Sequence, residues 1–526
     1  MAASASATQE EWANDDVYRA GEQYNHADQN TCPFQPTGFV SEYARHRDLL
    51  VTSWKQLKNS MMAAYFTCQH HTKNWTASQT YLLPLSKCTC TPELVTTRKL
   101  DLIQTHDRLP GQTFTFCKCI PDLIRLIHYS YIAVSPTRPR TAFVIPTLQL
   151  YQSLWHESSI PYTSFVVGLL SHQDKRSMQK LKARGRRGTS RQLRLPFSQA
   201  LNVYNQIQIL QTKILHKTLG LTTQDEWAST YPSCFGPKAC NEKGSLDEVY
   251  AIIAMDGNFQ HRHHRSASKD VPTEADYPSN FIPPSQIDGH QRNEETTANN
   301  TQGLETSCSD AHKAANNSGE KLYYPVSIID NLFTAFPGKN FGFLYDIGFH
   351  LNANVCKWNL LGTNIGQVKF GTSVFHAYVH QWACQLQYNP RYNLGWGLSD
   401  GEGMEHLWSQ IANLVGPLCS ATQVCRLQSI SLQCEYYGGK LKINLMSWLL
   451  RHLEQALNCI VDCQSRLDLL YQSPNQYTTE NYTQTFLEEQ WTKERNHYKN
   501  CKDDEVDQAI ELGKLLSLED ELRTAW

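Results

Sequence analysis

Two short apolar runs, each followed directly by an aspartate, constrain the fold of this chain more than any other feature. Residues 249–255 read VYAIIAM and precede Asp256, and residues 341–345 read FGFLY and precede Asp346. Runs that are apolar at nearly every position are typical of strands buried on both faces of a sheet. An aspartate at the end of such a strand is costly to bury without a partner. Because a bound cation offsets that cost, the pattern predicts metal-binding acids at one edge of a sheet.

A third acid lies in GLSDGEGMEHLWS, residues 397–409, which contains Glu402 and Glu405. If this segment is helical, the two glutamates share one face, and their spacing does not separate them. Asp, Asp and Glu in this order describe a metal-dependent nuclease core, because Mg²⁺ or Mn²⁺ prefers oxygen ligands and can clamp the attacking and leaving oxygens. We therefore predict that Asp256, Asp346 and one of the glutamates share metal ions. The alternatives are turn or strand-end roles for the aspartates and helix-surface or helix N-terminal roles for the glutamates.

Cysteines recur at close spacing between residues 68 and 119 of a chain that contains 17 of them. Pairs separated by one residue can present two thiolates to one ion, and a distant pair can complete a tetrahedron. We therefore predict a zinc module whose ligands come from Cys68, Cys88, Cys90, Cys117 and Cys119, without specifying which four bind. The alternative is that these side chains are small buried hydrophobes.

A second possible zinc site involves His376, His380 and Cys384, which recur every four residues. On a helix these three side chains would share one face, and Cys356 is the nearest candidate for a fourth ligand. A helix face that merely packs with His and Cys is an equally good interpretation.

The charges are unevenly distributed although the formal net charge is only −2. Residues 175–194 read KRSMQKLKARGRRGTSRQLR and are strongly basic, which favours phosphate neutralisation or nuclear import. A solvated linker is the alternative. The residues of this run that we predict to bind DNA are Lys180, Lys182, Arg184, Arg186 and Arg187.

The chain divides by composition into five regions. We expect a poorly ordered lead-in over 1–60, the cysteine cluster over 61–150, a helical basic region over 151–240, the catalytic core over 241–420 and a helical region over 421–526. A stretch at about 260–318 is poor in large apolar residues and predicts a disordered insertion. No signal peptide and no run of about 20 apolar residues is present, so we expect an intracellular protein that does not enter a membrane.

Five motifs resemble those of the Kyakuja-Dileera-Zisupton (KDZ) transposases of eukaryotes: AMDGNFQ, GEKLYYP, LYDIG, HAYVHQWACQLQYNPRY and GLSDGEGMEHLWS. The Cys-x-Cys pairs and SPTRPRTAF upstream resemble the cysteine cluster that accompanies these enzymes. The resemblance implies an α/β RNase H-like core with flanking helical regions, in which Asp256, Asp346 and Glu402 or Glu405 coordinate Mg²⁺. His376, His380 and Cys384 then belong to the element between the second acid and the glutamate.

Two functions follow as hypotheses. The first is a nuclear DNA transposase that cleaves transposon ends, joins them to target DNA and acts as a homo-oligomer. The second is a catalytically decayed or domesticated nuclear DNA-binding protein. The chain departs from the family pattern at Ser233-Cys234, Phe349 and His406, which favours the second hypothesis.

Overall fold

A computed structural model of the 526-residue chain describes residues 42–86, 88–177, 181–183, 191–237, 249–258, 261, 264, 271–289, 321–476, 478–500 and 514–515. The chain divides into two compact units, Met1–Gln56 and Leu57–Trp526. Of the first unit, the structure describes only the beginning of helix α1 (Glu42–His71). The predicted disordered insertion lies largely outside the described residues.

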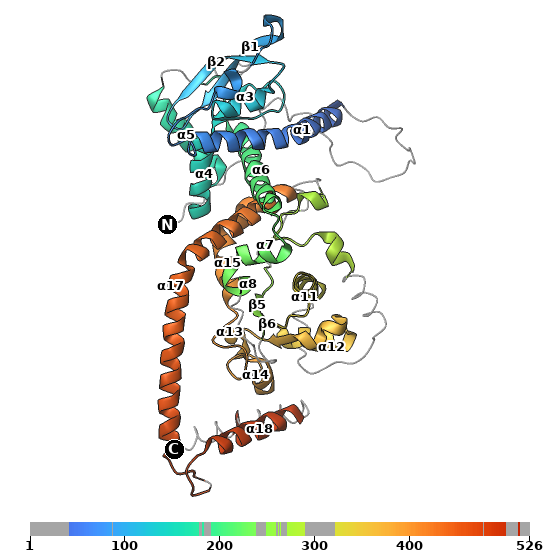
Figure 1. Ribbon diagram of the computed structural model, residues 1–526, viewed down its shortest axis with the longest axis vertical. Coiled ribbons are helices and arrows are strands. Elements are labelled where there is room, and N and C mark those ends of the chain that lie inside the picture. The colour runs from blue at the N-terminus through green and yellow to red at the C-terminus, as the bar shows by residue number, and fades with distance from the viewer. Residues whose placement is uncertain are drawn as a thin grey trace, which may run out of the picture. The chain divides into compact units, whose positions relative to one another are not determined.

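A four-stranded sheet of order β2-β1-β4-β3 forms the N-terminal part of the second unit (Figure 1). β1 (Val95–Ile103) and β2 (Arg108–Cys117) form an antiparallel hairpin. β4 (Thr141–Val144) pairs parallel to β1 and antiparallel to β3 (Tyr131–Ala133). Helix α2 (Leu83–Ser86) and the 3₁₀ turn η1 (Pro92–Leu94) precede β1, and helix α3 (Asp122–His128) connects β2 to β3.

The apolar segments around 131–144 form the strands β3 and β4. Both strands are almost entirely buried, and short apolar runs do not distinguish a buried strand from a buried helix by periodicity. Helices α4 (Ile145–Ser158), α5 (Tyr162–Arg176) and α6 (Arg194–Thr218) follow. Phe197 of α6 packs edge-to-face against Phe143 of β4, so α6 covers this sheet.

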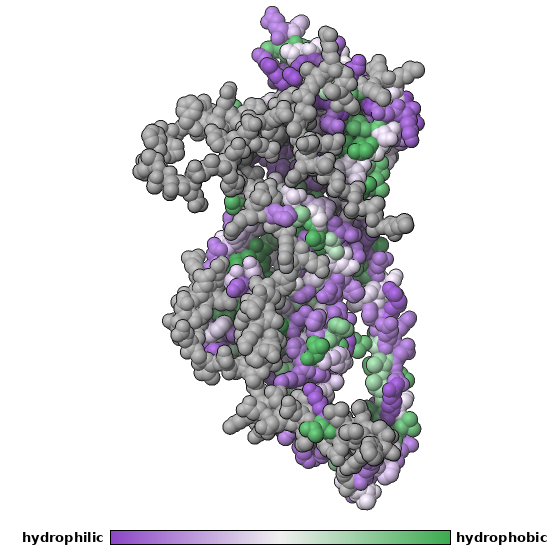
Figure 2. Space-filling view, turned by 180° about the vertical axis from the view of Figure 1, so that it is seen from behind, coloured by the Kyte–Doolittle hydropathy of each residue, from purple (hydrophilic) through white to green (hydrophobic). Residues whose placement is uncertain are grey.

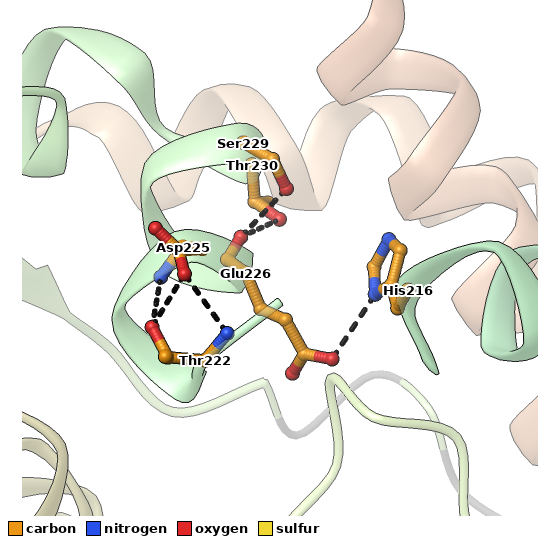
Figure 3. A network of polar contacts seen from close by, with 6 residues as sticks. All are labelled: His216, Thr222, Asp225, Glu226, Ser229 and Thr230. Carbon is orange, nitrogen blue, oxygen red and sulfur yellow. Dashed lines mark hydrogen bonds and ion pairs between the residues drawn. The ribbon is translucent and has the colours of Figure 1, made fainter. Parts of the chain in front are cut away.

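A polar network fixes the corner between α6 and α7 (Thr223–Thr230), as Figure 3 shows. The Thr222 hydroxyl accepts the backbone N–H of Asp225, and the Asp225 carboxylate accepts the backbone N–H of Thr222 at 2.9 Å. This capping box satisfies amide groups that the first turn of a helix leaves unpaired. His216, in the last turn of α6, lies 3.1 Å from the Glu226 carboxylate. The corner leads through α8 (Pro232–Phe235) toward the second sheet.

Three parallel strands in the order β5-β6-β7 form the second sheet. β5 (Ala251–Met255) and β6 (Phe341–Tyr345) are the two predicted strands, and their register pairs Met255 with Tyr345. β7 (Val368–Gly371) pairs with the other edge of β6. Helix α11 (Tyr323–Ala335) precedes β6, while α12 (Gly348–Trp358) and the 3₁₀ turn η3 (Gly362–Gln367) connect β6 to β7.

The core around this sheet is built mainly from aromatic and aliphatic side chains of α11, α12 and the strands. The indole of Trp396 lies on β6 and β7 and is only 4% exposed. A Cβ at Gly342 would come within 2.8 Å of this ring, and one at Gly371 within 3.0 Å. Glycine is therefore required at both positions for Trp396 to cover the sheet.

The segment after β7 forms two short helices, α13 (Val374–Ala377) and α14 (Trp382–Tyr388). Our expectation that His376, His380 and Cys384 share one helix face does not hold, because a turn separates the two helices. α15 (Gly403–Ile411), η4 (Ala412–Leu414) and α16 (Val415–Leu418) follow.

Two further helices complete the described chain. α17 (Gln423–Tyr471) is a single helix of 49 residues. α18 (Gln484–Asn500) packs on α14, and Trp382 Nε1 of α14 donates a hydrogen bond of 2.9 Å to the Glu494 carboxylate of α18. The short 3₁₀ turn η2 (Glu274–Asp276) lies between β5 and α11. The described chain is thus a mixed α/β protein with a large helical content. Among the helices described, none combines the length and the apolar character needed to cross a bilayer.

Candidate functional site

Asp256 and Asp346 leave the second sheet at the same edge. They follow Met255 and Tyr345, which are register partners on adjacent parallel strands. The carboxyl ends of parallel strands in an open α/β sheet are where ligands commonly bind. Both side chains are partly exposed at this edge. The two acids therefore follow neighbouring strands of one sheet.

Helix α15 brings a third acid toward this edge. Trp408 Nε1 donates a 2.6 Å hydrogen bond to Asp256 Oδ2, which ties α15 to the end of β5. Glu405 lies three residues before Trp408, on the same side of the helix. Trp408 also packs against the buried cluster of Ile411, Leu414 and Leu418, which fixes the position of its indole.

Asp346 is held by hydrogen bonds from the segment after β7. Ser373 Oγ donates to Asp346 Oδ1 at 2.7 Å, and His376 Nδ1 lies 3.2 Å from the same oxygen. Burial raises the pKa of Asp346, and the negative charges of Asp256 and Glu405 raise it further, whereas the bond from Ser373 and the charge of His376 oppose the shift. The site therefore concentrates negative charge that the surrounding residues only partly neutralise.

His380 contacts the backbone of the same aspartate. Its imidazole donates to the backbone carbonyl of Asp346 and packs at 4.9 Å, centroid to centroid, against Phe349. Burial lowers the pKa of His380, which keeps its ring neutral. Burial raises the pKa of the Tyr388 phenol, and the nearby thiols of Cys384 and Cys356 add to this shift. Both histidines thus contact Asp346, and within the described residues they do not form a metal-spaced group with Cys384.

Glu402 and Glu405 have different surroundings, which their spacing did not reveal. Glu402 accepts the backbone N–H of Phe375 at 3.2 Å, and Val374 N–H donates to Asp400 at 2.7 Å. Gly401 has a φ of +86°, and a Cβ there would lie 2.8 Å from Ser373. Glu402 thus joins the loop before α15 to the start of α13, whereas Glu405 is exposed.

Four cysteines gather at the end of the first sheet. The Sγ atoms of Cys88, Cys117 and Cys119 lie 3.1–3.4 Å from one another, and Cys90 completes a group whose ligand atoms all lie within 4.8 Å. This group could bind a metal such as zinc. It is the one group of three or more His, Cys, Asp or Glu side chains with such spacing in the described residues.

The local charge favours a thiolate at Cys117. Burial acts to raise the pKa of Cys117, but hydrogen bonds from Cys119, Cys88, the backbone of Ile120 and the guanidinium of Arg125 outweigh it and lower the pKa to about 6. Arg125 Nη2 lies 2.8 Å from the sulfur. A thiolate is the form that binds zinc. The pKa of Cys119 is raised, first by its hydrogen bond with Cys117, as expected for thiols that share a proton.

Cys68 lies outside this group. It is buried at the end of α1, and its Sγ lies 3.3 Å from Nδ1 of His128. Burial raises the pKa of its thiol to about 12, so Cys68 is protonated and packs as a small apolar side chain.

Only part of the predicted DNA-binding run can be placed. Lys180, Arg184, Arg186 and Arg187 lie outside the described residues, and Lys182 is exposed. Arg191, in the same basic run, forms an ion pair with Asp101 of β1.

Several contacts at the site were not apparent from the sequence. Ser373 and Trp408 touch the two aspartates, but a lone serine and a helix tryptophan carry no spacing signal. Arg125 could have been noticed because it lies in the first turns of the helix after Cys119.

Two protein-family models match this chain, one in the region that carries Asp346 and the glutamates and one in the region of the cysteine cluster. Residues 316–437 match the family model of the Kyakuja-Dileera-Zisupton transposase, and residues 74–178 match the CxC1 like cysteine cluster associated with KDZ transposases. These matches confirm the resemblance inferred from the motifs. The first range contains Asp346 and both glutamates, and the second contains the four clustered cysteines but not Cys68. No curated protein and no solved structure matches the chain.

Proposed function

We propose that this chain is a KDZ-type transposase that cleaves DNA strands and transfers them to target DNA, with Asp256, Asp346 and Glu405 as its acidic triad. The family matches support a transposase-type function that acts on DNA. The assignment of the triad rests on the placement of its residues. Asp256 and Asp346 follow β5 and β6 at the same edge of the sheet, and the indole of Trp408 on α15 donates a hydrogen bond to Asp256. The proposal includes an RNase H-like core, a nuclear location and a homo-oligomer that holds two DNA ends.

The donor set at this edge fits a hard cation. Two carboxylates follow adjacent strands, and the pKa of Asp346 is raised by burial and then by Asp256 and Glu405, so the site is short of positive charge. Mg²⁺ or Mn²⁺ bound there would supply charge neutralisation at the attacking and leaving oxygens of an in-line displacement.

The neighbouring residues position these carboxylates. Trp408 orients Asp256, while Ser373 and His376 both contact the same oxygen of Asp346. Glu402 holds the start of α13, which carries His376. We therefore assign Glu405, rather than Glu402, as the third acid.

Cleavage assays on DNA that flanks the coding sequence test this assignment. We expect Asp256→Asn, Asp346→Asn and Glu405→Gln each to abolish Mg²⁺-dependent cleavage, because each removes a ligand charge while preserving shape. Glu402→Gln is the matched control and should retain cleavage, since a neutral amide oxygen can still accept the Phe375 N–H. Unchanged cleavage by Asp256→Asn contradicts the triad, and loss in Glu402→Gln with activity in Glu405→Gln reverses the choice of glutamate.

DNA binding is proposed to depend on the basic run and to be separable from cleavage. Reversing the charge of Lys182 and Arg184 to Glu should weaken binding to all sequences. It should also make the plot of log K against log salt concentration shallower, by about 0.9 in slope for each DNA phosphate that is no longer neutralised. Lys493→Glu on α18 makes the same kind of change elsewhere and should leave that slope unchanged. Asp256→Asn should bind as the unmodified protein does.

A second candidate function is a non-catalytic DNA-binding protein. It is favoured by the fact that, over the described residues, only the cysteines gather closely enough to hold a metal ion. If the unmodified protein binds DNA but cleaves it with neither Mg²⁺ nor Mn²⁺, this second function replaces the first.

A further inference from the structure

Helix α17 carries a long apolar face that nothing in the described chain covers. Its first turns are anchored, since Ser431, Leu432 and Gln433 are buried and the helix packs on α15. From Leu441 onward, large apolar side chains of this helix are exposed to solvent. In Figure 1 this part of α17 extends as one straight helix, and in Figure 2 apolar and polar residues alternate along it at the right edge.

These side chains follow a seven-residue repeat. Spacings of three and four residues alternate without a break from Ile443 to Tyr471. We call these nine positions the α17 stripe: Ile443, Met446, Leu450, Leu453, Leu457, Ile460, Gln464, Leu467 and Tyr471. A strict repeat of 3.5 residues is the signature of a coiled coil, whereas a helix packed on a globular core follows a period nearer 3.6.

The exposure of the α17 stripe is high for apolar residues. Its seven aliphatic members are between 36% exposed, at Leu467, and 83% exposed, at Ile443. Continuous apolar surface of this length is rare on monomeric soluble proteins and marks an interaction site. Leu449 and Val461 flank the stripe and are also exposed, which widens the apolar face.

The opposite face of the helix has no comparable pattern. The positions midway around the helix from the stripe are Leu441, Trp448, Gln455, Asp462 and Leu469, so polar residues interrupt them. Arg466 and Asp462 form an ion pair on this side at 3.0 Å. The opposite face also exposes Leu441, Trp448 and Leu469, but only the α17 stripe repeats without a break along the helix.

We propose that the α17 stripe is a self-association surface on which two copies of this chain form a parallel, in-register coiled coil. Two copies of the stripe would together remove on the order of 1,200 Å² from water, which is where specific protein interfaces begin. A second copy is the natural partner, because it offers the same repeat over the same length.

Gln464 specifies the direction of the pair. It is the one polar amide in the α17 stripe, at the position equivalent to Ile443, Leu450 and Leu457. In a parallel, in-register pair, Gln464 faces Gln464 of the second copy, and the two amides can bond to each other. In an antiparallel pair it would face an aliphatic residue and lack that partner. One buried polar residue of this kind sets register and oligomeric state in coiled coils.

The mass of the full chain in solution tests the proposal without DNA, so its result is independent of the proposed strand transfer. We expect light scattering to give about 120 kDa for the unmodified protein, twice the 60.1 kDa of one chain. The double variant Leu453→Glu/Leu457→Glu should give the mass of one chain. Gln455→Glu/Asn458→Glu adds the same charges on other faces of the same two turns and should remain dimeric.

Three outcomes overturn the proposal. In the first, the unmodified protein has the mass of one chain at all concentrations. In the second, the stripe variant keeps the mass of the dimer. In the third, the stripe variant has a lower melting temperature but an unchanged mass, which means that the stripe packs within its own chain. Because these leucines are exposed in the single chain, the variant should fold, and its melting temperature reports this directly.

The register has a separate test. Leu450→Cys, expressed as a mixture of isotope-labelled and unlabelled chains and oxidised mildly, should yield a disulfide between position 450 of a labelled and of an unlabelled chain. Mass spectrometry of the peptides distinguishes this bond from links among native cysteines. A dimer that forms links from position 450 only to other positions overturns the parallel register.

Discussion

Ser373 is buried between the second aspartate and the histidine of α13, and its hydroxyl contacts both. It donates to Asp346 at 2.7 Å and lies 3.0 Å from Nδ1 of His376. A residue that orients a metal ligand typically contributes about 10- to 100-fold in metal affinity. We therefore predict that Ser373→Ala weakens binding of Mn²⁺ to the acidic site by about this factor.

A matched control is available in the same core. Ser327 of α11 is also buried, and its hydroxyl donates to the backbone carbonyl of Tyr323 at 2.6 Å, away from the acids. Ser327→Ala should leave Mn²⁺ affinity, measured by calorimetry or electron paramagnetic resonance, unchanged. Equal losses in the two variants would show that the effect of Ser373 comes from folding and not from the carboxylate that it orients.

Two buried cysteines should respond differently to substitution. The pKa of Cys117 is lowered to about 6, so its thiolate is available near neutral pH, whereas burial raises the pKa of Cys68 to about 12. We predict that Cys117→Ser removes one equivalent of bound zinc and exposes the cluster to proteolysis. Cys68→Ala should keep the zinc and change only the packing. Native mass spectrometry measures the stoichiometry, and full zinc content in Cys117→Ser would exclude this cysteine as a ligand.

At the scale of the element, Thr222 determines how α7 begins. Its hydroxyl and the Asp225 carboxylate form the reciprocal pair that caps the helix (Figure 3). Trp227 on the same helix packs against the core of the second sheet. Replacing an N-cap threonine with alanine costs about 1 kcal/mol. We expect Thr222→Ala to lower the free energy of unfolding by that amount, measured by urea titration, and Thr222→Ser to retain most of it. Equal stability of the two variants contradicts the capping role.

At the scale of the element, the sequence was sufficient to predict two strands of the second sheet. The runs before Asp256 and Asp346 predicted strands correctly, since a chain that is apolar at every position is compatible with a strand covered on both faces. In contrast, the four-residue spacing of His376, His380 and Cys384 suggested one helix, but hydrogen bonds of Asp346 to Ser373 and His376 hold α13 as a separate short helix. Tertiary contacts with an aspartate 30 residues away leave no trace in local periodicity.

The choice between Glu402 and Glu405 was also beyond the sequence. Both residues are acids near a helix start, and only the fold places the backbone of Phe375 beside one of them. The cysteine cluster was easier to predict because its ligands come in pairs with one intervening residue. Even there, the exclusion of Cys68 depends on its burial beside His128, which is 60 residues away.

At the scale of the whole molecule, the contact of α4 with α17 joins the cysteine-cluster region to the region that carries the acids. His156 Nδ1 forms a hydrogen bond of 2.8 Å with Gln433 Oε1, and its ring stacks on Tyr436 with 4.2 Å between the ring centroids. Glu157 forms an ion pair of 2.7 Å with Lys440. Burial lowers the pKa of His156, an effect that the bond to Gln433 and the charge of Glu157 only partly oppose. The contact is therefore formed with a neutral imidazole.

Acid should weaken this contact, and the sign follows from proton binding. Because the folded pKa of His156 is below the value of about 6.5 for an unfolded histidine, the unfolded chain binds more protons as the pH falls through that value. Stability is then present above about pH 6.5 and declines below it. Burial also lowers the pKa of His128, His261 and His380. His156→Gln should therefore reduce, but not abolish, the slope of the unfolding free energy against pH. Urea midpoints between pH 7.5 and 5.5 measure the slope, with His452→Gln on the exposed part of α17 as the control. Identical slopes for His156→Gln and the unmodified protein would mean that this contact does not depend on the charge of His156.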